Sequence, residues 1–201
     1  MGRIGLLGGT FDPPHVGHLI LAAVAADSLA LDAVWFVPAG DPPHKRGQAI
    51  TPVAHRLEML HLAVAGNDQF HVSRIDVDRP GPHYSVDMVA LARAQRPEAE
   101  WFFLVGGDSL RDLPTWHQPQ RLLELCSLAV LRRPGAAVDM AHLRDLLPGV
   151  EQKVIFVDGP GVDISGTAIT GRVRAGRTIR YMVPDAVRDY ILTQGLYREA
   201  S

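Results

Sequence analysis

Two histidines three positions apart, His15 and His18, follow a glycine-rich turn near the start of this 201-residue chain. Three residues make about one helical turn, so both imidazoles can face the same site from the first turn of a helix. An imidazole can hydrogen-bond a phosphate oxygen and, when protonated, offsets its charge. Gly8 and Gly9 precede the histidines, and glycine lets a backbone approach a ligand without an intervening Cβ. Together these residue types predict a site for the phosphates of a nucleotide.

The flanking segments predict a strand, then a turn, then a helix. Residues 4–7 form a short apolar run, and residues 19–30 are rich in Ala and Leu and contain no Gly or Pro. The start of a helix adds free N–H groups and the positive end of the helix dipole, which both suit phosphate. A plain turn or a solvated histidine is the alternative for any one of these residues alone. The string matches neither the P-loop nor the G-x-G-x-x-G fingerprint.

Two further segments follow apolar strands and carry polar residues. Residues 33–38 predict a buried parallel strand, and the loop after it contains Lys45. At the carboxyl end of a second parallel strand this basic loop would face the first turn, although a solvated basic loop is equally compatible. Residues 101–105 predict the most apolar strand, followed by Gly106 and Asp108. Asp108 could accept a hydrogen bond from a ribose hydroxyl, hold a metal-bound water, or cap its own helix.

Two other segments have both a structural and a functional interpretation. Trp116 lies in a Pro-bounded loop, where its ring offers a stacking surface for a flat ligand, although core packing fits the pattern equally well. Ser165 and Thr167 stand at the expected start of a late helix. Their hydroxyls can cap that helix or bind an anion.

Regular alternation of strands and helices predicts an α/β fold with a doubly wound, mainly parallel sheet and helices on both faces. Residues 70–77 alternate polar and apolar side chains, which predicts a strand with one wet face. We expect one domain over residues 1–201, with residues 163–201 forming a C-terminal helical segment.

Composition limits the classes of partner and compartment. The net charge of −2 predicts no broad nucleic-acid or membrane surface, so an anion site must be a local cluster. The longest apolar run, residues 19–26, is too short to span a bilayer. The single cysteine, Cys126, lies in an apolar run and predicts a buried, inert thiol and a reducing compartment. We therefore expect a cytoplasmic protein. The sequence leaves its oligomeric state open, a homo-oligomer included.

The segments T-F-D-P at residues 10–13 and H-V-G-H at 15–18 resemble the H-x-G-H signature of the nucleotidyltransferase superfamily. Within it, the chain most resembles the bacterial nicotinate-mononucleotide adenylyltransferases. The resemblance continues through P-P-H-K at 42–45, Tyr84 and Ser85, residues 106–110, L-P-T-W at 113–116, R-P-G at 133–135 and residues 164–167. The first segment is shared by many nucleotidyltransferases, whereas the ordered combination is specific to this family.

The resemblance implies a Rossmann-like fold and transfer of an adenylyl group from ATP to nicotinate mononucleotide in NAD biosynthesis, with Mg²⁺ as cofactor and no metal ligand from the protein. It implies catalytic roles for His15, His18 and Lys45. It implies ATP contacts for Gly8, Gly9, Thr10, Phe11, Gly106, Asp108, Ile164, Ser165 and Thr167, with residues 163–201 closing the ATP site. It implies mononucleotide contacts for Tyr84, Ser85, Trp116 and Arg133. The alternatives are an adenylyltransferase for nicotinamide mononucleotide or another phosphorylated acceptor, and a non-catalytic nucleotide-binding protein.

This sequence departs from the family pattern at three places. The usual I-S-S-T-x-I-R has Gly166 in place of a serine and Thr170 in place of the arginine, so ATP affinity is the property most affected. Arg172 or Arg174 would have to replace that arginine. The S-Y-T motif becomes H-Y-S at residues 83–85, and the residue after the tryptophan, often aromatic, is His117.

Overall fold

The structure, a computed structural model, describes residues 2–40, 50–132 and 138–198. Six parallel strands form one sheet in the order β3-β2-β1-β4-β5-β6. The strands are β1 (Arg3–Gly9), β2 (Ala33–Pro38), β3 (Phe70–Val72), β4 (Glu100–Gly106), β5 (Ser127–Arg132) and β6 (Val154–Asp158). The helices are α1 (Val16–Ser28), α2 (Val53–Val64), α3 (Ser85–Gln95), α4 (Gly107–Asp112), α5 (Pro119–Leu125), α6 (Met140–Leu146), α7 (Gly166–Arg174) and α8 (Asp185–Thr193), with short 3₁₀ helices η2 (Leu113–Thr115) and η3 (Val150–Gln152).

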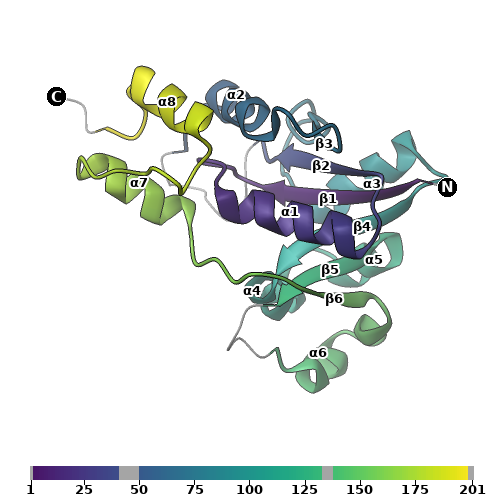
Figure 1. The fold of residues 1–201 in the computed structure, drawn as a ribbon. Helices are drawn as coiled ribbons and strands as arrows, with labels where there is room; N and C mark the ends of the chain where they lie inside the picture. The colour runs from purple at the N-terminus through teal and green to yellow at the C-terminus, as the bar shows by residue number, and fades with distance from the viewer. Residues whose placement is uncertain (1, 41–49, 133–137, 199–201) are drawn as a thin grey trace.

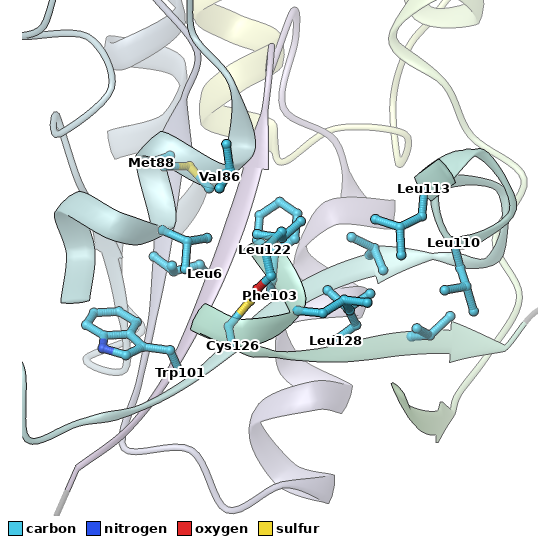
Figure 2. Packing of buried hydrophobic residues seen from close by; sticks show 14 of the residues in the cluster. Leu6, Val86, Met88, Trp101, Phe103, Leu110, Leu113, Leu122, Cys126 and Leu128 are labelled. Carbon is cyan, nitrogen blue, oxygen red and sulfur yellow. Dashed lines mark hydrogen bonds between the residues drawn. The ribbon is translucent and has the colours of Figure 1, made fainter. Parts of the chain in front are cut away.

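Side chains of the central strands alternate between two apolar layers. Trp101 and Phe103 of β4 belong to the layer under α3 and α5, whereas Phe102 and Leu104 belong to the layer under α1 and α2. Figure 2 shows the first layer, in which the labelled residues are Leu6, Val86, Met88, Trp101, Phe103, Leu110, Leu113, Leu122, Cys126 and Leu128. Burial on both faces explains why β4 is continuously apolar, and it confirms the predicted doubly wound sheet with helices on both sides.

A third apolar cluster joins the C-terminal helices to α2. Ile169 and Val173 of α7 and Val187 and Ile191 of α8 pack with Met59 of α2. Figure 1 shows α8 beside α2 and α7 below α8, with α1 lying across the near face of the sheet. The backbone N–H of Val16, the first residue of α1, also donates to the carbonyl of Met182 at 3.0 Å. The C-terminal segment is thereby attached next to the start of α1.

Two sequence predictions differ from the structure at element boundaries. The strand predicted over residues 70–77 ends at Val72. Among the described residues β3 pairs with β2 alone, and the Ser73 N–H still donates to the carbonyl of Phe36 at 2.9 Å. The next donor in register on β2 would be Pro38, which has no N–H, so the ladder stops there. The first helix starts at Val16, three residues earlier than predicted, because His15 serves as its N-cap.

Cys126 behaves as the sequence predicts. Its side chain is 4% exposed, its thiol donates to the carbonyl of Leu122 at 3.4 Å, and burial raises its pKa to about 12. A thiol with so high a pKa is protonated at neutral pH and is a poor nucleophile.

Candidate active site

A cavity of about 830 Å³ opens at the carboxyl ends of β1, β2 and β4. The chain runs outward from β1 to β3 on one side of the sheet and then crosses to β4 on the other side. Loops at such a reversal diverge, so open α/β sheets bind ligands there. The cavity is lined by predicted site residues from both halves of the sheet: Gly8, Gly9, Thr10, His18, Tyr84, Ser85, Gly106 and Trp116.

The two histidines are fixed to each other by the start of α1. His15 is the N-cap, and its backbone N–H donates to Nδ1 of His18 at 3.1 Å. Their rings stack with centroids 3.7 Å apart and an interplanar angle of 26°. Because Nδ1 of His18 accepts this hydrogen bond, the proton of the neutral ring sits on Nε2. His18 lines the cavity, whereas His15 lies behind it and is 8% exposed.

The charge state of His18 follows from its surroundings. Burial lowers the pKa of His18 well below its ordinary value, and the neighbouring His15 lowers it further. The ring is therefore neutral at physiological pH. Of the two phosphate interactions that the sequence leaves open, hydrogen-bond donation from Nε2–H is the one that this geometry favours.

Packing within the protein also explains the glycines before α1. A Cβ on Gly9 would lie 3.3 Å from the ring of Phe11, and one on Gly8 would lie 3.3 Å from the end of Met88. Phe11 is 2% exposed, has a φ of 50°, and meets the ring of His18 edge-on at 4.9 Å. Phe11 therefore supports His18 from beneath and does not line the cavity.

Aromatic rings form the other wall of the cavity. Tyr84 is the N-cap of α3, and its ring stacks on His117 at 4.1 Å with an angle of 26°. Trp116 meets Phe103 edge-on, with centroids 6.0 Å apart. Trp116 both lines the cavity and packs against the apolar layer, so the two interpretations of this residue hold together.

Several predicted residues lie outside the cavity lining. Asp108 forms an ion pair with Arg111 in the first turn of α4. Ser165 caps α7 by accepting from the backbone N–H of Ala168 at 3.2 Å. The flanking Ile164 and Thr167 are also absent from the lining. Two others, Lys45 and Arg133, fall outside the described residues.

The sequence does not single out a buried ion pair beside the aromatic wall. Asp76 is 3% exposed, lines the cavity and pairs with Arg79 at 2.6 Å. Burial raises the pKa of Asp76, and Arg79 opposes that shift. Arg79 also donates to the carbonyls of Pro82 at 2.9 Å and Tyr84 at 3.4 Å. The pair therefore fixes the turn that carries Tyr84. The strand predicted over residues 70–77 includes Asp76 but not Arg79, so the prediction did not reveal the pair.

A second group missed by the sequence lies behind the β1–α1 turn. Arg56 of α2 is 1% exposed, and Asp12 accepts from the Tyr197 hydroxyl at 2.6 Å and from the Thr51 N–H at 3.0 Å. The available signal was that Arg56 shares the apolar face of α2 with Met59 and other buried residues at helical spacing. A lone arginine in such a pattern usually extends to solvent, so the pattern alone did not reveal it.

The described residues provide no protein cage for a metal ion. No three His, Cys, Asp or Glu side chains gather closely enough to bind one in the ranges that the structure covers. Within the same ranges no helix is long and apolar enough to cross a membrane.

The histidine turn is the segment from Gly9 at the end of β1 to His18 in the first turn of α1, and it lies where the strand order of the sheet reverses. This turn and the fold together define a nucleotidyltransferase. The family model that matches residues 6–172 is described as Cytidylyltransferase-like, and the chain belongs to that family. Its relatives narrow the class to the nicotinate-nucleotide adenylyltransferases. A protein of Thermomicrobium roseum named as a probable nicotinate-nucleotide adenylyltransferase is 52% identical over 98% of this chain and 92% of its own length. One of Geobacillus thermodenitrificans with the same name is 43% identical over 98% of this chain and 87% of its own length.

Solved structures support the fold independently. The Plasmodium falciparum nicotinic acid mononucleotide adenylyltransferase complexed with NaAD superposes with a TM-score of 0.80 at 16% identity, covering 98% of both chains. A putative nicotinate-nucleotide adenylyltransferase from Vibrio parahaemolyticus gives 0.71 at 17% identity, covering 100% of this chain and 98% of its own. At such low identity the likeness concerns the arrangement of strands and helices.

Proposed function

We propose that this enzyme transfers the adenylyl group of ATP to nicotinate mononucleotide, giving nicotinate adenine dinucleotide and pyrophosphate in NAD biosynthesis. One observation carries the proposal: a single cavity at the sheet reversal is lined on one side by His18 and the glycine turn and on the other by Tyr84 and Trp116. A cavity of about 830 Å³ is at the upper end of the range of small-molecule sites. The family of the relatives agrees with this pairing.

The chemistry requires no nucleophile from the protein. The 5′-phosphate of the mononucleotide is already anionic, and one of its oxygens attacks the α-phosphorus of ATP in line. A new P–O bond forms while the bond to the bridging oxygen breaks and pyrophosphate leaves. Catalysis is then a matter of positioning the two phosphates and stabilising the charge that moves toward the leaving group.

The histidine turn supplies the groups for that stabilisation. The Nε2–H of His18 donates to a phosphate oxygen, and the dipole of α1 adds positive potential at the start of the helix. His15 holds His18 in its tautomer through the backbone hydrogen bond and the ring stack. Thr10 and the two glycines bring backbone close to the triphosphate, and the proposal assigns Lys45 a catalytic contact with it.

The mononucleotide occupies the aromatic side. In this proposal the pyridine ring stacks on Trp116, and backbone N–H groups near Ser85 receive its carboxylate. The proposal also assigns Arg133 to the mononucleotide, whereas Gly106 and Asp108 belong to the ATP side, where Asp108 contacts ribose.

The C-terminal segment, residues 163–201, closes the ATP site through Ile164, Ser165 and Thr167. A Cβ on Gly166 would lie 2.8 Å from the carbonyl oxygen of Asp12, so the start of α7 rests directly on the histidine turn. Arg172 donates to the carbonyl of Thr178 at 2.7 Å, and Arg174 lines a separate cavity. These contacts argue against either arginine replacing the one absent at Thr170.

Magnesium enters this scheme with ATP. Mg²⁺ would be held mostly by ATP oxygens and water and would neutralise charge on the triphosphate. The buried thiol of Cys126 suits a reducing compartment, and we place the reaction in the cytoplasm.

A coupled assay of pyrophosphate release tests the proposal. Purified protein is mixed with ATP, Mg²⁺ and either nicotinate or nicotinamide mononucleotide. We expect release with both components present and a higher kcat/KM for the acid than for the amide. A preference for the amide would transfer the assignment to that substrate. Binding of ATP without pyrophosphate release from either mononucleotide would leave a nucleotide-binding protein without this activity.

A further inference from the structure

Arg56 lies outside the cavity and joins the loops that form its phosphate side. Its Nη1 donates to the carbonyls of Thr10 at 2.8 Å and Ala39 at 2.9 Å. Its Nη2 donates to the carbonyl of Gly40 at 3.1 Å, and its Nε to that of Thr51 at 2.9 Å. One guanidinium on α2 thus holds the chain after β1, the chain after β2 and the segment before α2.

These carbonyls belong to peptide groups at the cavity. Thr10 and Ala39 both line it. In a trans peptide the C=O and the following N–H point in opposite directions. The peptides that turn their carbonyls to Arg56 therefore turn the N–H groups of Phe11 and Gly40 away from it. Arg56 sets the orientation of backbone donors on two loops at once, without touching the space that a ligand would fill.

Asp12 completes the arrangement from the same side. It accepts from the Tyr197 hydroxyl at 2.6 Å and the Thr51 N–H at 3.0 Å. Burial lowers the pKa of Arg56, and the Asp12 carboxylate opposes that shift. Arg56 and Asp12 share Thr51, which donates to one and accepts from the other. The histidine turn is thereby held by α2 and by the C-terminal segment together.

Another arginine shows what a purely structural role looks like. Arg93 of α3 is partly buried, and its Nη1 donates to the carbonyl of Leu125 at the end of α5, 2.7 Å away. Neither residue lines the cavity. Arg93 and Arg56 both lie on a helix and donate to backbone carbonyls of other segments, so they differ mainly in which segments they hold.

We propose that Arg56, with Asp12 and Tyr197 behind it, is a positioning residue for ATP, because it fixes the two loops that frame the triphosphate side of the cavity. This inference rests on the proposed function for the identity of the nucleotide. It concerns ATP, because within the described part of the chain the hydrogen bonds of Arg56 reach Thr10, Ala39, Gly40 and Thr51 and none reaches the aromatic side with Tyr84 and Trp116.

The test compares four variants: Arg56→Met, Arg56→Lys, Tyr197→Phe and the matched control Arg93→Met. For each, the dissociation constant of ATP is measured by calorimetry, and kcat and both KM values by pyrophosphate release. All measurements are made at a temperature at which circular dichroism shows that each variant in the comparison is folded. If Arg56→Met does not fold, Arg56→Lys and Tyr197→Phe carry the comparison.

We expect Arg56→Met to lower kcat/KM for ATP by about 10²-fold, the size of effect produced by a small displacement of positioning groups. Arg56→Lys should restore part of this loss, because an ammonium donates hydrogen bonds but cannot reach four carbonyls. Tyr197→Phe should weaken ATP binding by no more than about tenfold. The KM for the mononucleotide should stay within twofold throughout, and Arg93→Met should lower Tm and leave ATP binding unchanged.

Two results would overturn the inference. One is wild-type ATP affinity in folded Arg56→Lys and Tyr197→Phe. The other is an equal rise in both KM values, which would mean general loosening of the cavity. Failure of the proposed function would appear differently, as ATP binding by the wild type without pyrophosphate release, and the calorimetric comparison would still decide the role of Arg56.

Discussion

The connections after β1 and β4 begin with the same sequence pattern but are built differently. Each follows a buried strand with two glycines, at Gly8 and Gly9 in one case and Gly106 and Gly107 in the other. After β1 both glycines are strand residues, and α1 starts seven positions past Gly9. After β4 the helix α4 starts at once, at Gly107, and has only six residues.

Crowding distinguishes the two connections most clearly. A Cβ on Gly9 would meet the buried ring of Phe11 at 3.3 Å, whereas one on Gly106 would meet nothing within 4 Å. The β1–α1 turn is also held by Arg56, by Asp12 and by the start of α7. Similar local sequences therefore place both turns at the cavity, and long-range packing makes only one of them rigid. We associate that rigidity with the phosphate chemistry.

The largest expected effect concerns the rigid turn. His18→Ala removes the Nε2–H donor and should lower kcat by roughly 10²–10³, as measured for loss of one oriented charge-stabilising donor. Steady-state kinetics check this, with His61→Ala, an exposed histidine of α2, as the matched control expected to retain wild-type kcat. A His18→Ala enzyme with more than half of the wild-type kcat would remove His18 from the mechanism.

The glycine comparison gives a smaller effect on stability. Gly9→Ala should lower the free energy of unfolding by about 1–3 kcal/mol, because the Phe11 ring is 2% exposed and has little room to move. Gly106→Ala should change it by less than about 0.5 kcal/mol, because the site is open. Urea denaturation of both variants measures the difference. Equal destabilisation would show that the two turns are equally constrained.

The smallest expected effect is a pH dependence of folding stability that arises from His18 in the rigid turn. The pKa of His18 is lowered in the folded state, so below the ordinary histidine pKa the unfolded chain binds a proton that the folded chain does not. His18 therefore contributes stability that is lost as pH falls from about 7 toward its lowered pKa. His18→Gln should lose less stability than wild type between pH 7 and 5 in urea titrations. Parallel pH profiles would contradict this assignment.

Local patterns in the sequence predicted the elements well where the hydrophobic period of a segment agrees with its packing in the folded chain. The strand predicted over residues 33–38 matches β2. The prediction failed after Val72, because alternation indicates a strand only while a neighbour is available to pair with it. Strand pairing is a property of the whole sheet, and a local window does not contain it.

The residues of the candidate site differ in the same way, because some follow from a local sequence pattern and others do not. His18 and Trp116 could be predicted because their neighbours in sequence carry the pattern, and both line the cavity. Arg56 could not, since its acceptors are distributed over residues 10, 39, 40 and 51 and come together only in the folded chain. The sequence leaves two roles open for Ser165, helix capping and anion binding, and in the structure its hydroxyl caps α7.

The hydrogen bond between Tyr197 and Asp12 joins residues 185 positions apart. On the ribosome Asp12 is made first, and Tyr197 follows 185 positions later. A nascent chain can assemble the central strands before then, but the turn that carries Asp12 still lacks its hydrogen bond from Tyr197. Completion of this turn is thus coupled to synthesis of the segment that carries Tyr197.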